Sequence, residues 1–253
     1  MSDDALGLDE AYSVKTPEDN KRLYAKWAAT YDSSFVDAKQ YRYPKAISEV
    51  FDQVVTDSVT RVLDIGTGTG LLSLQLAQKL PSAFIDAVEL DPAAAAQAAQ
   101  NAAASNFNIQ VHNIDIKNYS GKKYQHIISN PPFFENDLKS EHALKNQAMH
   151  STTLSLQTLF TCADDLLEPA GSFSILLPFA RANEVETLAQ SHGFSIAHKA
   201  VVQQTPNHAP FRVMYIFGKT VFETTSETSI VIKENDRYTP IFIAYLKDYY
   251  LYL

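Results

Sequence analysis

The sequence predicts an α/β fold with a mostly parallel sheet covered by helices, and three observations support this prediction. From residue 61 onward, short apolar runs alternate with segments of helical periodicity. A glycine-rich turn at 64–70 directly follows the first run, and a carboxylate, Glu89, ends the second. In doubly wound sheets the carboxyl ends of the strands carry the ligand site, so both features are expected at one edge.

The chain has 253 residues, which fits one globular domain with at most a small appendage. Residues 1–15 are acidic and lack apolar periodicity, so we expect a flexible tail. Thr16, Pro17, Glu18 and Asp19 are typical of a helix start. A second helix is expected at 45–56. Residues 16–58 are therefore predicted to form an N-terminal helical cap, and residues 59–253 the main domain.

The main domain can be divided by its hydrophobic pattern. Apolar runs rich in β-branched residues predict strands at 61–65, 83–89, 109–113, 124–129 and 172–177. Helical spacing, or the alanine-rich composition of 93–104, predicts helices at 71–80, 92–105, 154–167 and 181–192. Strands 195–203 and 212–217 are expected to complete a seven-stranded sheet as an antiparallel edge. A run at 229–233 and a helix at 238–250 complete the chain.

Charge and hydropathy exclude several classes of protein. The net charge of −8 argues against broad, sequence-blind adhesion to nucleic acid, so any RNA contact must be local. No apolar run reaches the length of a membrane span and the first residues are acidic, which predicts a soluble, cytoplasmic protein. The candidate basic positions are Lys117, Lys122, Lys123, Lys139, His142, Lys145, His198, Lys199 and Arg212.

Cysteine and histidine usage argues against metal and nucleophilic chemistry. The single cysteine, Cys162, excludes an internal disulfide and a cysteine-based metal cluster, and its apolar neighbours predict a buried, inert thiol. The seven histidines lack metal-ligand spacing, and there is no nucleophile elbow. We therefore predict no metal site.

The turn after the first strand is a candidate cofactor loop. It carries Asp64, Gly66, Thr67, Gly68 and Gly70, and its glycines let the backbone approach a ligand closely. The Gly-x-Gly-x-Gly spacing differs from the dinucleotide fingerprint and lacks the Gly-Lys-Ser/Thr of a phosphate-binding loop. Taken alone, the motif also fits an ordinary tight turn.

Acidic residues follow the next two strands. Glu89, with Leu90 beside it, is placed to accept hydrogen bonds from the two hydroxyls of a ribose. It could instead cap the next helix, but Asp91 before Pro92 suits that role better. After the third strand, Asp115 could accept from an adenine amine while its neighbour Ile116 packs on the ring.

Together these residues resemble the class I S-adenosylmethionine-dependent methyltransferases over about residues 61–116. The resemblance implies a Rossmann-like class I methyltransferase fold and S-adenosyl-L-methionine as the cofactor. The sulfonium already carries an activated methyl group, so such an enzyme has mainly to align an acceptor with it and exclude water.

The segment Asn130, Pro131, Pro132 and Phe133 indicates the acceptor. The side-chain oxygen of Asn130 and the carbonyl of Pro131 can accept from the two hydrogens of a planar amine, while Phe133 offers a face for stacking. This segment is our candidate catalytic clamp, and Asn130 also borders the cofactor. Adenine N6 and a glutamine amide both fit it, and two prolines also make a stiff turn.

A narrower resemblance rests on 128–134, on 148–154, and on Arg212, Ile230 to Lys233 and Arg237 to Leu251 near the end. Over about residues 60–253 the chain resembles the bacterial tRNA1(Val) adenine-N6 methyltransferase family, which acts at position 37 beside the anticodon. This resemblance implies a tRNA substrate bound through local basic patches. We also expect the protein to be a monomer. Phe134, His150 and Arg212 are the candidate substrate-binding residues.

The front of the chain departs from that family. Its phenylalanine-rich, glycine-containing lead-in is replaced by a segment similar to the helical entry of small-molecule class I methyltransferases. In such an entry Tyr24, Trp27 and Tyr31 would cover the cofactor, although core packing explains them equally well. Two alternatives therefore stay open: a methyltransferase acting on a glutamine amide or a small molecule, and an inactive cofactor-binding protein associated with RNA.

Overall fold

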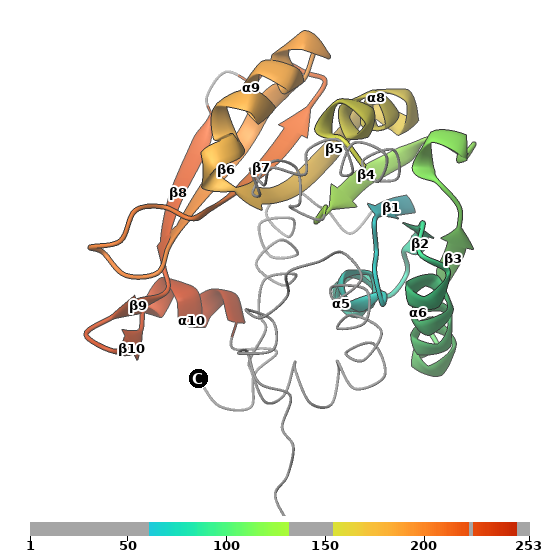
Figure 1. Cartoon of the computed structure of the whole chain (residues 1–253), viewed down its shortest axis with the longest axis horizontal. Helices are drawn as coiled ribbons and strands as arrows, with labels where there is room; N and C mark the ends of the chain where they lie inside the picture. The colour runs from blue at the N-terminus through green and yellow to red at the C-terminus, as the bar shows by residue number, and fades with distance from the viewer. Residues whose placement is uncertain (1–60, 132–153, 223–224, 247–253) are drawn as a thin grey trace, which may run out of the picture.

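The computed structural model describes residues 61–131, 154–222 and 225–246 (Figure 1). The predicted tail and helical cap lie outside these residues, so the boundary at 58/59 stays a prediction. The elements in chain order are β1 (Arg61–Ile65), α5 (Leu71–Lys79), β2 (Phe84–Glu89), α6 (Pro92–Ser105), β3 (Ile109–Asn113), η2 (Ile116–Asn118), β4 (Tyr124–Ser129), α8 (Leu156–Leu166), β5 (Leu167–Pro178), η4 (Phe179–Arg181), α9 (Ala182–Ser191), β6 (Ser195–Gln203), β7 (Arg212–Gly218), β8 (Ser226–Val231), β9 (Lys233–Glu234), β10 (Arg237–Tyr238) and α10 (Pro240–Leu246).

The sheet confirms the α/β fold. Its strand order is β3-β2-β1-β4-β5-β7-β6-β8, and neighbouring strands from β3 to β5 run parallel. β7 runs antiparallel to both of its neighbours, β5 and β6. β8 then pairs in parallel with β6. The reversal at β7 brings the beginning of that strand to the edge where the parallel strands end.

Two details of the predicted sheet are wrong. The described sheet has eight strands, not seven, and its antiparallel strand lies inside it and not at the edge. The reason is β8, which begins at Ser226 and forms the true edge beside β6. Its first residues are polar and mostly exposed, so they give no apolar alternation for a sequence prediction to detect. β9 and β10 form a separate two-stranded hairpin.

β5 begins earlier than predicted, at Leu167 in place of residue 172. Pro169 and Gly171 suggested a turn. In the structure Tyr124 pairs with Leu167 while His126 pairs with Ser172, so an irregularity in the ladder accommodates the extra residues. The other predicted helices and strands of the described chain are present, with ends that differ by a few residues.

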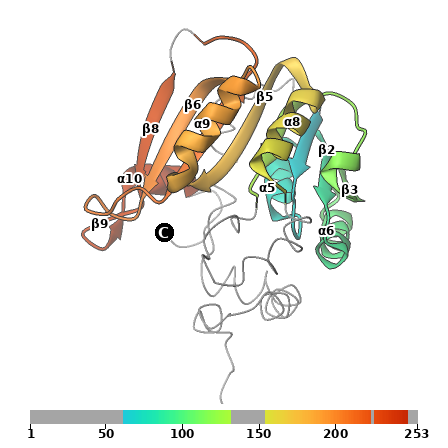
Figure 2. The same cartoon turned by 45° about the horizontal axis from the view of Figure 1, so that its top comes forward.

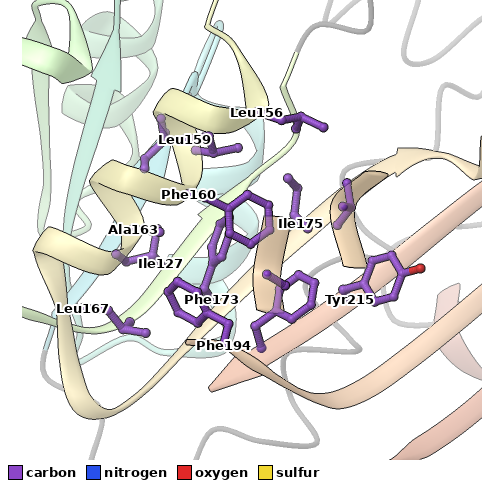
Figure 3. Packing of buried hydrophobic residues seen from close by; sticks show 14 of the residues in the cluster. Ile127, Leu156, Leu159, Phe160, Ala163, Leu167, Phe173, Ile175, Phe194 and Tyr215 are labelled. Atoms are coloured by element: carbon purple, nitrogen blue, oxygen red, sulfur yellow. The ribbon is translucent and has the colours of Figure 1, made fainter. Parts of the chain in front are cut away.

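Helices cover both faces of the sheet (Figures 1 and 2). α8 and α9 pack on one face, where Phe160 lies against Phe173 and Phe194 (Figure 3). The ring of Phe217 also contacts Phe160 there. The centres of the Phe160 and Phe173 rings are 5.3 Å apart and the rings meet edge to face, which is a geometry that aromatic pairs prefer. On the opposite face, α5 and α10 contribute Leu76 and Phe242 to the second core.

Three further sequence predictions concern side chains and hydropathy. Cys162 is a free thiol that is only half-buried, and burial raises its pKa. Within the described chain there is no cluster of three or more potential metal ligands. Among the same residues, no helix is both long and apolar enough to cross a membrane.

A buried histidine in β4 makes stability depend on pH. His126 is 7% exposed, and its Nδ1 lies 2.6 Å from the hydroxyl of Ser172. Burial lowers the pKa of His126 from 6.5 to about 4. The unfolded chain therefore binds this proton near pH 6.5, while the folded chain binds it only near pH 4. As the pH falls from about 6.5 to about 4, the free energy of unfolding therefore decreases, by up to about 1.4 kcal/mol per pH unit.

The variant His126→Asn tests this linkage. Asparagine keeps a polar atom for Ser172 but cannot take up the proton. The stability advantage of the wild type over the variant should be largest near pH 7.5 and should shrink by about 2 kcal/mol at pH 4.5. Urea denaturation at both pH values measures it. The titration of groups such as Asp64 contributes equally to both proteins and cancels when their free energies of unfolding are subtracted. A difference in free energy that does not change with pH would therefore contradict the role assigned to His126.

Candidate functional site

The candidate site is built at the carboxyl edge of the parallel strands. β1, β2, β3 and β4 end at Ile65, Glu89, Asn113 and Ser129. The ladder pairs Ile65 with Ser129 and Glu89 with Asn113. The predicted glycine turn, the predicted ribose carboxylate and the predicted clamp residue Asn130 therefore lie at one edge of adjacent strands. The β1/β4 junction is the switch point at which the strand order reverses, where such sheets bind ligands.

The glycine turn has the conformation that its sequence requires. Gly66, Gly68 and Gly70 have φ values of +75°, +59° and +86°, which side-chain-bearing residues adopt at a cost. The amides of Gly66 and Thr67 both donate to the carbonyl of Val88. A Cβ atom at Gly66 or Gly68 would meet no atom of the described residues within 4 Å, so these residues leave space beside the backbone in that part of the chain. Gly70 instead lies against Ala98 of α6, where a Cβ would approach to 3.2 Å.

Asp64 anchors this turn from the end of β1. Its Oδ2 accepts hydrogen bonds from the hydroxyls of Thr67 and Ser73, at 2.7 and 2.6 Å. The side chain is 1% exposed, and burial raises its pKa from 3.8 to about 6. Oδ1 is buried and has no hydrogen-bond partner among the described residues. A buried acceptor without a partner destabilises the folded protein unless a ligand donates a hydrogen bond to it.

Ser73 was missed by the sequence analysis. It lies in the first turn of α5 and is fully buried. A serine facing the interior there was a usable signal, because a buried hydroxyl needs a partner and Asp64 is the nearest predicted carboxylate.

Glu89 joins β2 to the glycine turn. One carboxylate oxygen accepts from the Gly68 amide at 2.8 Å and the other from the Asp91 amide at 2.9 Å. The residue is half-buried, so its remaining lone pairs are available to hydroxyl donors. Asp91 caps α6 by accepting from the amides of Ala93 and Ala94, as predicted.

Asn113 is a second residue that the sequence analysis passed over. Its side-chain amide donates to the carbonyls of Glu89 and Leu90, at 3.0 Å each. It thereby fixes the backbone that carries the predicted ribose ligand. Leu90 itself is 44% exposed, so its side chain lies at the surface beside the site.

Asp115 and Ile116 follow β3 at the same edge. Asp115 caps η2 by accepting from the Lys117 amide at 3.0 Å, and its other oxygen pairs with the Lys117 ammonium at 3.1 Å. Ile116 is 6% exposed and belongs to the core on the α8 side. Both side chains thus already have structural roles, and their predicted contacts with adenine stay predictions.

Asn130 stands directly after β4. Its Oδ1 is buried and has no hydrogen-bond partner among the described residues, while Pro131 beside it is buried. Just before it, Ser129 donates through its hydroxyl to the carbonyl of Ile65 at 2.8 Å. A buried acceptor at a ligand-binding edge, without a described partner, is suited to an incoming N–H group. The predicted site residues Pro132, Phe133, Phe134, His150, Tyr24, Trp27 and Tyr31 lie outside the described residues.

Arg212 is brought to the same edge by the reversed direction of β7. It is the first residue of that strand and pairs with Pro178, the last residue of β5. Two strand spacings, roughly 10 Å, separate its strand from that of Asn130. The half-buried guanidinium donates to the carbonyl of Phe211 and lies 5.5 Å from the centre of the Phe211 ring. Its predicted role in substrate binding stays a prediction.

The strand order, the glycine turn after β1 and the carboxylate at the end of β2 define a class I S-adenosylmethionine-dependent methyltransferase. The chain belongs to the methyltransferase small domain family, whose model matches residues 45–197. S-adenosylmethionine is the cofactor of this family. The predicted resemblance to class I methyltransferases is therefore confirmed.

Several relatives that share one name are similar to this chain over most of its length. The chain is 39% identical over 204 residues to the tRNA1(Val) (adenine(37)-N6)-methyltransferase of Dickeya chrysanthemi, across 76% of this chain and 81% of the relative. It is 37% identical over 202 residues to the protein of the same name from Pectobacterium carotovorum, across 78% and 82%. The homologue from Parabacteroides distasonis is 35% identical over 202 residues, across 78% and 85%.

Solved structures agree on the fold. One match is a predicted O-methyltransferase from Agrobacterium tumefaciens, with a TM-score of 0.59, 18% identity, and coverage of 77% of this chain and 91% of that one. Another is an S-adenosylmethionine-dependent methyltransferase from Clostridium acetobutylicum, with a TM-score of 0.54, 14% identity, and coverage of 77% and 98%. At these identities the likeness concerns the fold alone.

Proposed function

We propose that this methyltransferase modifies the exocyclic N6 amine of an adenosine in tRNA, at position 37 of tRNA1(Val). The observation that carries the proposal is the Oδ1 of Asn130, which is buried, has no hydrogen-bond partner in the described part of the chain, and lies beside the glycine turn at the switch point of the sheet. The names of the homologues support the same substrate.

The residues at the edge fit the cofactor. Oδ1 of Asp64 lacks a partner among the described residues and suits an ammonium group, while Glu89 has free lone pairs for the hydroxyls of a ribose. No described residue fills the space beside Gly66 and Gly68, which allows a ligand to approach their backbone closely. We assign cofactor binding to these residues, with Thr67, Gly70, Leu90, Asp115, Ile116 and Asn130 around them. When bound, S-adenosylmethionine supplies an electrophilic methyl group.

Asn130 and Pro131 act on the amine in this proposal. The lone pair of an adenine amine is delocalised into the ring, so the free amine is a poor nucleophile. Acceptance of its two hydrogens by the Asn130 side chain and the Pro131 carbonyl localises electron density on nitrogen and orients it. The amine becomes acidic only when methylated and can then release a proton to water. No residue with a strongly shifted pKa is needed for this step.

The tRNA itself is expected to bind by local contacts. The net charge of −8 disfavours a broad phosphate-binding face, whereas Arg212 lies at the same edge as Asn130. Arginine can pair with phosphate or stack on a base. Such an enzyme works as a cytoplasmic protein, and we expect it to act as a monomer.

Nucleoside analysis tests the proposal. The purified protein is incubated with S-adenosylmethionine and total tRNA that lacks N6-methyladenosine, and the digested tRNA is examined by mass spectrometry. N6-methyladenosine is the expected product. Its absence, together with a methylated glutamine peptide or metabolite, would replace tRNA with one of those substrates. Cofactor binding without turnover on any of these substrates would instead indicate an inactive RNA-associated protein.

A further inference from the structure

One buried hydroxyl joins the two halves of the candidate site. Ser129 is fully buried, and its Oγ donates to the carbonyl of Ile65 at 2.8 Å. Ile65 is the residue before the glycine turn, and Ser129 is the residue before Asn130. The two are partners in the β1/β4 register, although 64 positions separate them in the chain. This bond is therefore a direct link between the cofactor turn and the clamp.

The peptide unit between Ile65 and Gly66 is bonded on both sides. Its N–H, from Gly66, donates to the carbonyl of Val88 in β2 at 2.9 Å. Its carbonyl, from Ile65, accepts the hydroxyl of Ser129 in β4. The first bond ties the turn to the strand that leads to the predicted ribose ligand Glu89. The second ties the same peptide plane to the strand that leads to the predicted amine acceptor.

We propose that Ser129 is a positioning residue that sets the orientation of Asn130 relative to the glycine turn. The inference rests on the proposed role of Asn130. Without the hydroxyl, the β2 side of the turn keeps its bonds from Gly66, Thr67 and Gly68, so the cofactor cradle persists. The β4 side loses its side-chain bond to that cradle and keeps only the backbone pairing of β1 with β4. Misplacement of reacting groups by about 1 Å can lower a rate by about 10²-fold.

The test compares Ser129→Ala with Ser174→Ala. Ser174 is equally buried, at 2% exposure, and lies on the neighbouring strand β5, where it pairs with Ile128. Its hydroxyl has no hydrogen-bond partner among the described residues. Both variants thus remove one buried oxygen, and only the first removes a link between the two halves of the site.

The expected result separates turnover from binding. In Ser129→Ala, kcat with unmodified tRNA falls about 10- to 100-fold, while the calorimetric Kd for S-adenosylhomocysteine stays near the wild-type value. Hydrogen exchange speeds up at the amide of Asn130, while the amide of Gly66, which keeps its bond to Val88, exchanges at the wild-type rate. In Ser174→Ala these three quantities stay near the wild-type values.

Two results would overturn the inference: equal kcat values in the two variants, or a parallel loss of cofactor affinity and melting temperature in Ser129→Ala. If the wild type modifies no tRNA, the proposed substrate is wrong. The exchange and calorimetric measurements then still decide whether Ser129 couples the turn to Asn130, since neither requires a substrate.

Discussion

The variant Asn130→Ala is expected to lose methyl transfer to tRNA almost completely while keeping its cofactor affinity. The removed Oδ1 is buried and unpartnered among the described residues, so its loss breaks no described hydrogen bond of the folded protein. Removal of one preorganised hydrogen-bonding group around a reacting centre typically lowers kcat by about 10²- to 10³-fold. Transfer of tritiated methyl groups to unmodified tRNA measures the rate, and calorimetry with S-adenosylhomocysteine measures the affinity.

A matched control for this variant is Asn207→Ala. Asn207 is an exposed asparagine in the connection between β6 and β7, so its removal changes the same side chain outside the clamp. We expect the control to retain wild-type activity. Full activity in Asn130→Ala would rule out the clamp, whatever the substrate is.

The variant Glu89→Gln is expected to weaken binding of S-adenosylhomocysteine about 100-fold, or about 3 kcal/mol. The wild-type carboxylate accepts from the amides of Gly68 and Asp91 with its two oxygens. A glutamine keeps one acceptor oxygen but turns an NH₂ group toward one of these N–H donors. It therefore disturbs the glycine turn and also loses a charged acceptor for the ribose hydroxyls.

The neighbouring variant Asp91→Asn controls for the loss of one negative charge at this edge. Asparagine caps a helix about as well as aspartate, so α6 keeps the bonds to Ala93 and Ala94. The affinity for S-adenosylhomocysteine should stay near the wild-type value. If Asp91→Asn and Glu89→Gln weaken binding of S-adenosylhomocysteine equally, the loss of affinity comes from the lost negative charge at this edge. A direct contact between Glu89 and the ligand would then be ruled out as its cause.

The sequence allowed most of the sheet to be predicted, because strands buried on both faces are continuous apolar runs. β1 and β4 contain the shorter apolar pairs Val62–Leu63 and Ile127–Ile128, and their predicted bounds match the structure. β8 was predicted poorly, since an edge strand exposes much of its length and Ser226 to Ser229 carry no apolar pattern. Its pairing with β6 depends on tertiary contacts that no local pattern records.

The same contrast holds for the candidate site. Asp64, Glu89 and Asn130 could be located because each lies at or just after the end of an apolar run, and such positions meet at one edge of a parallel sheet. Ser129 and Asn113 could not, because each is recognised only by a partner on another strand. Residues that support a site can be identified only from their neighbours in the folded structure. Spacing along the sequence does not reveal those neighbours.

The most direct test of the central claim uses two transcripts of tRNA1(Val) that differ only at position 37. One carries adenosine there and the other guanosine, which has no N6 amine. Tritiated methyl groups should enter the adenosine transcript as N6-methyladenosine and should be absent from the guanosine transcript. Equal incorporation into both transcripts, or none into either, would contradict the assignment of this site to the amine of adenosine 37.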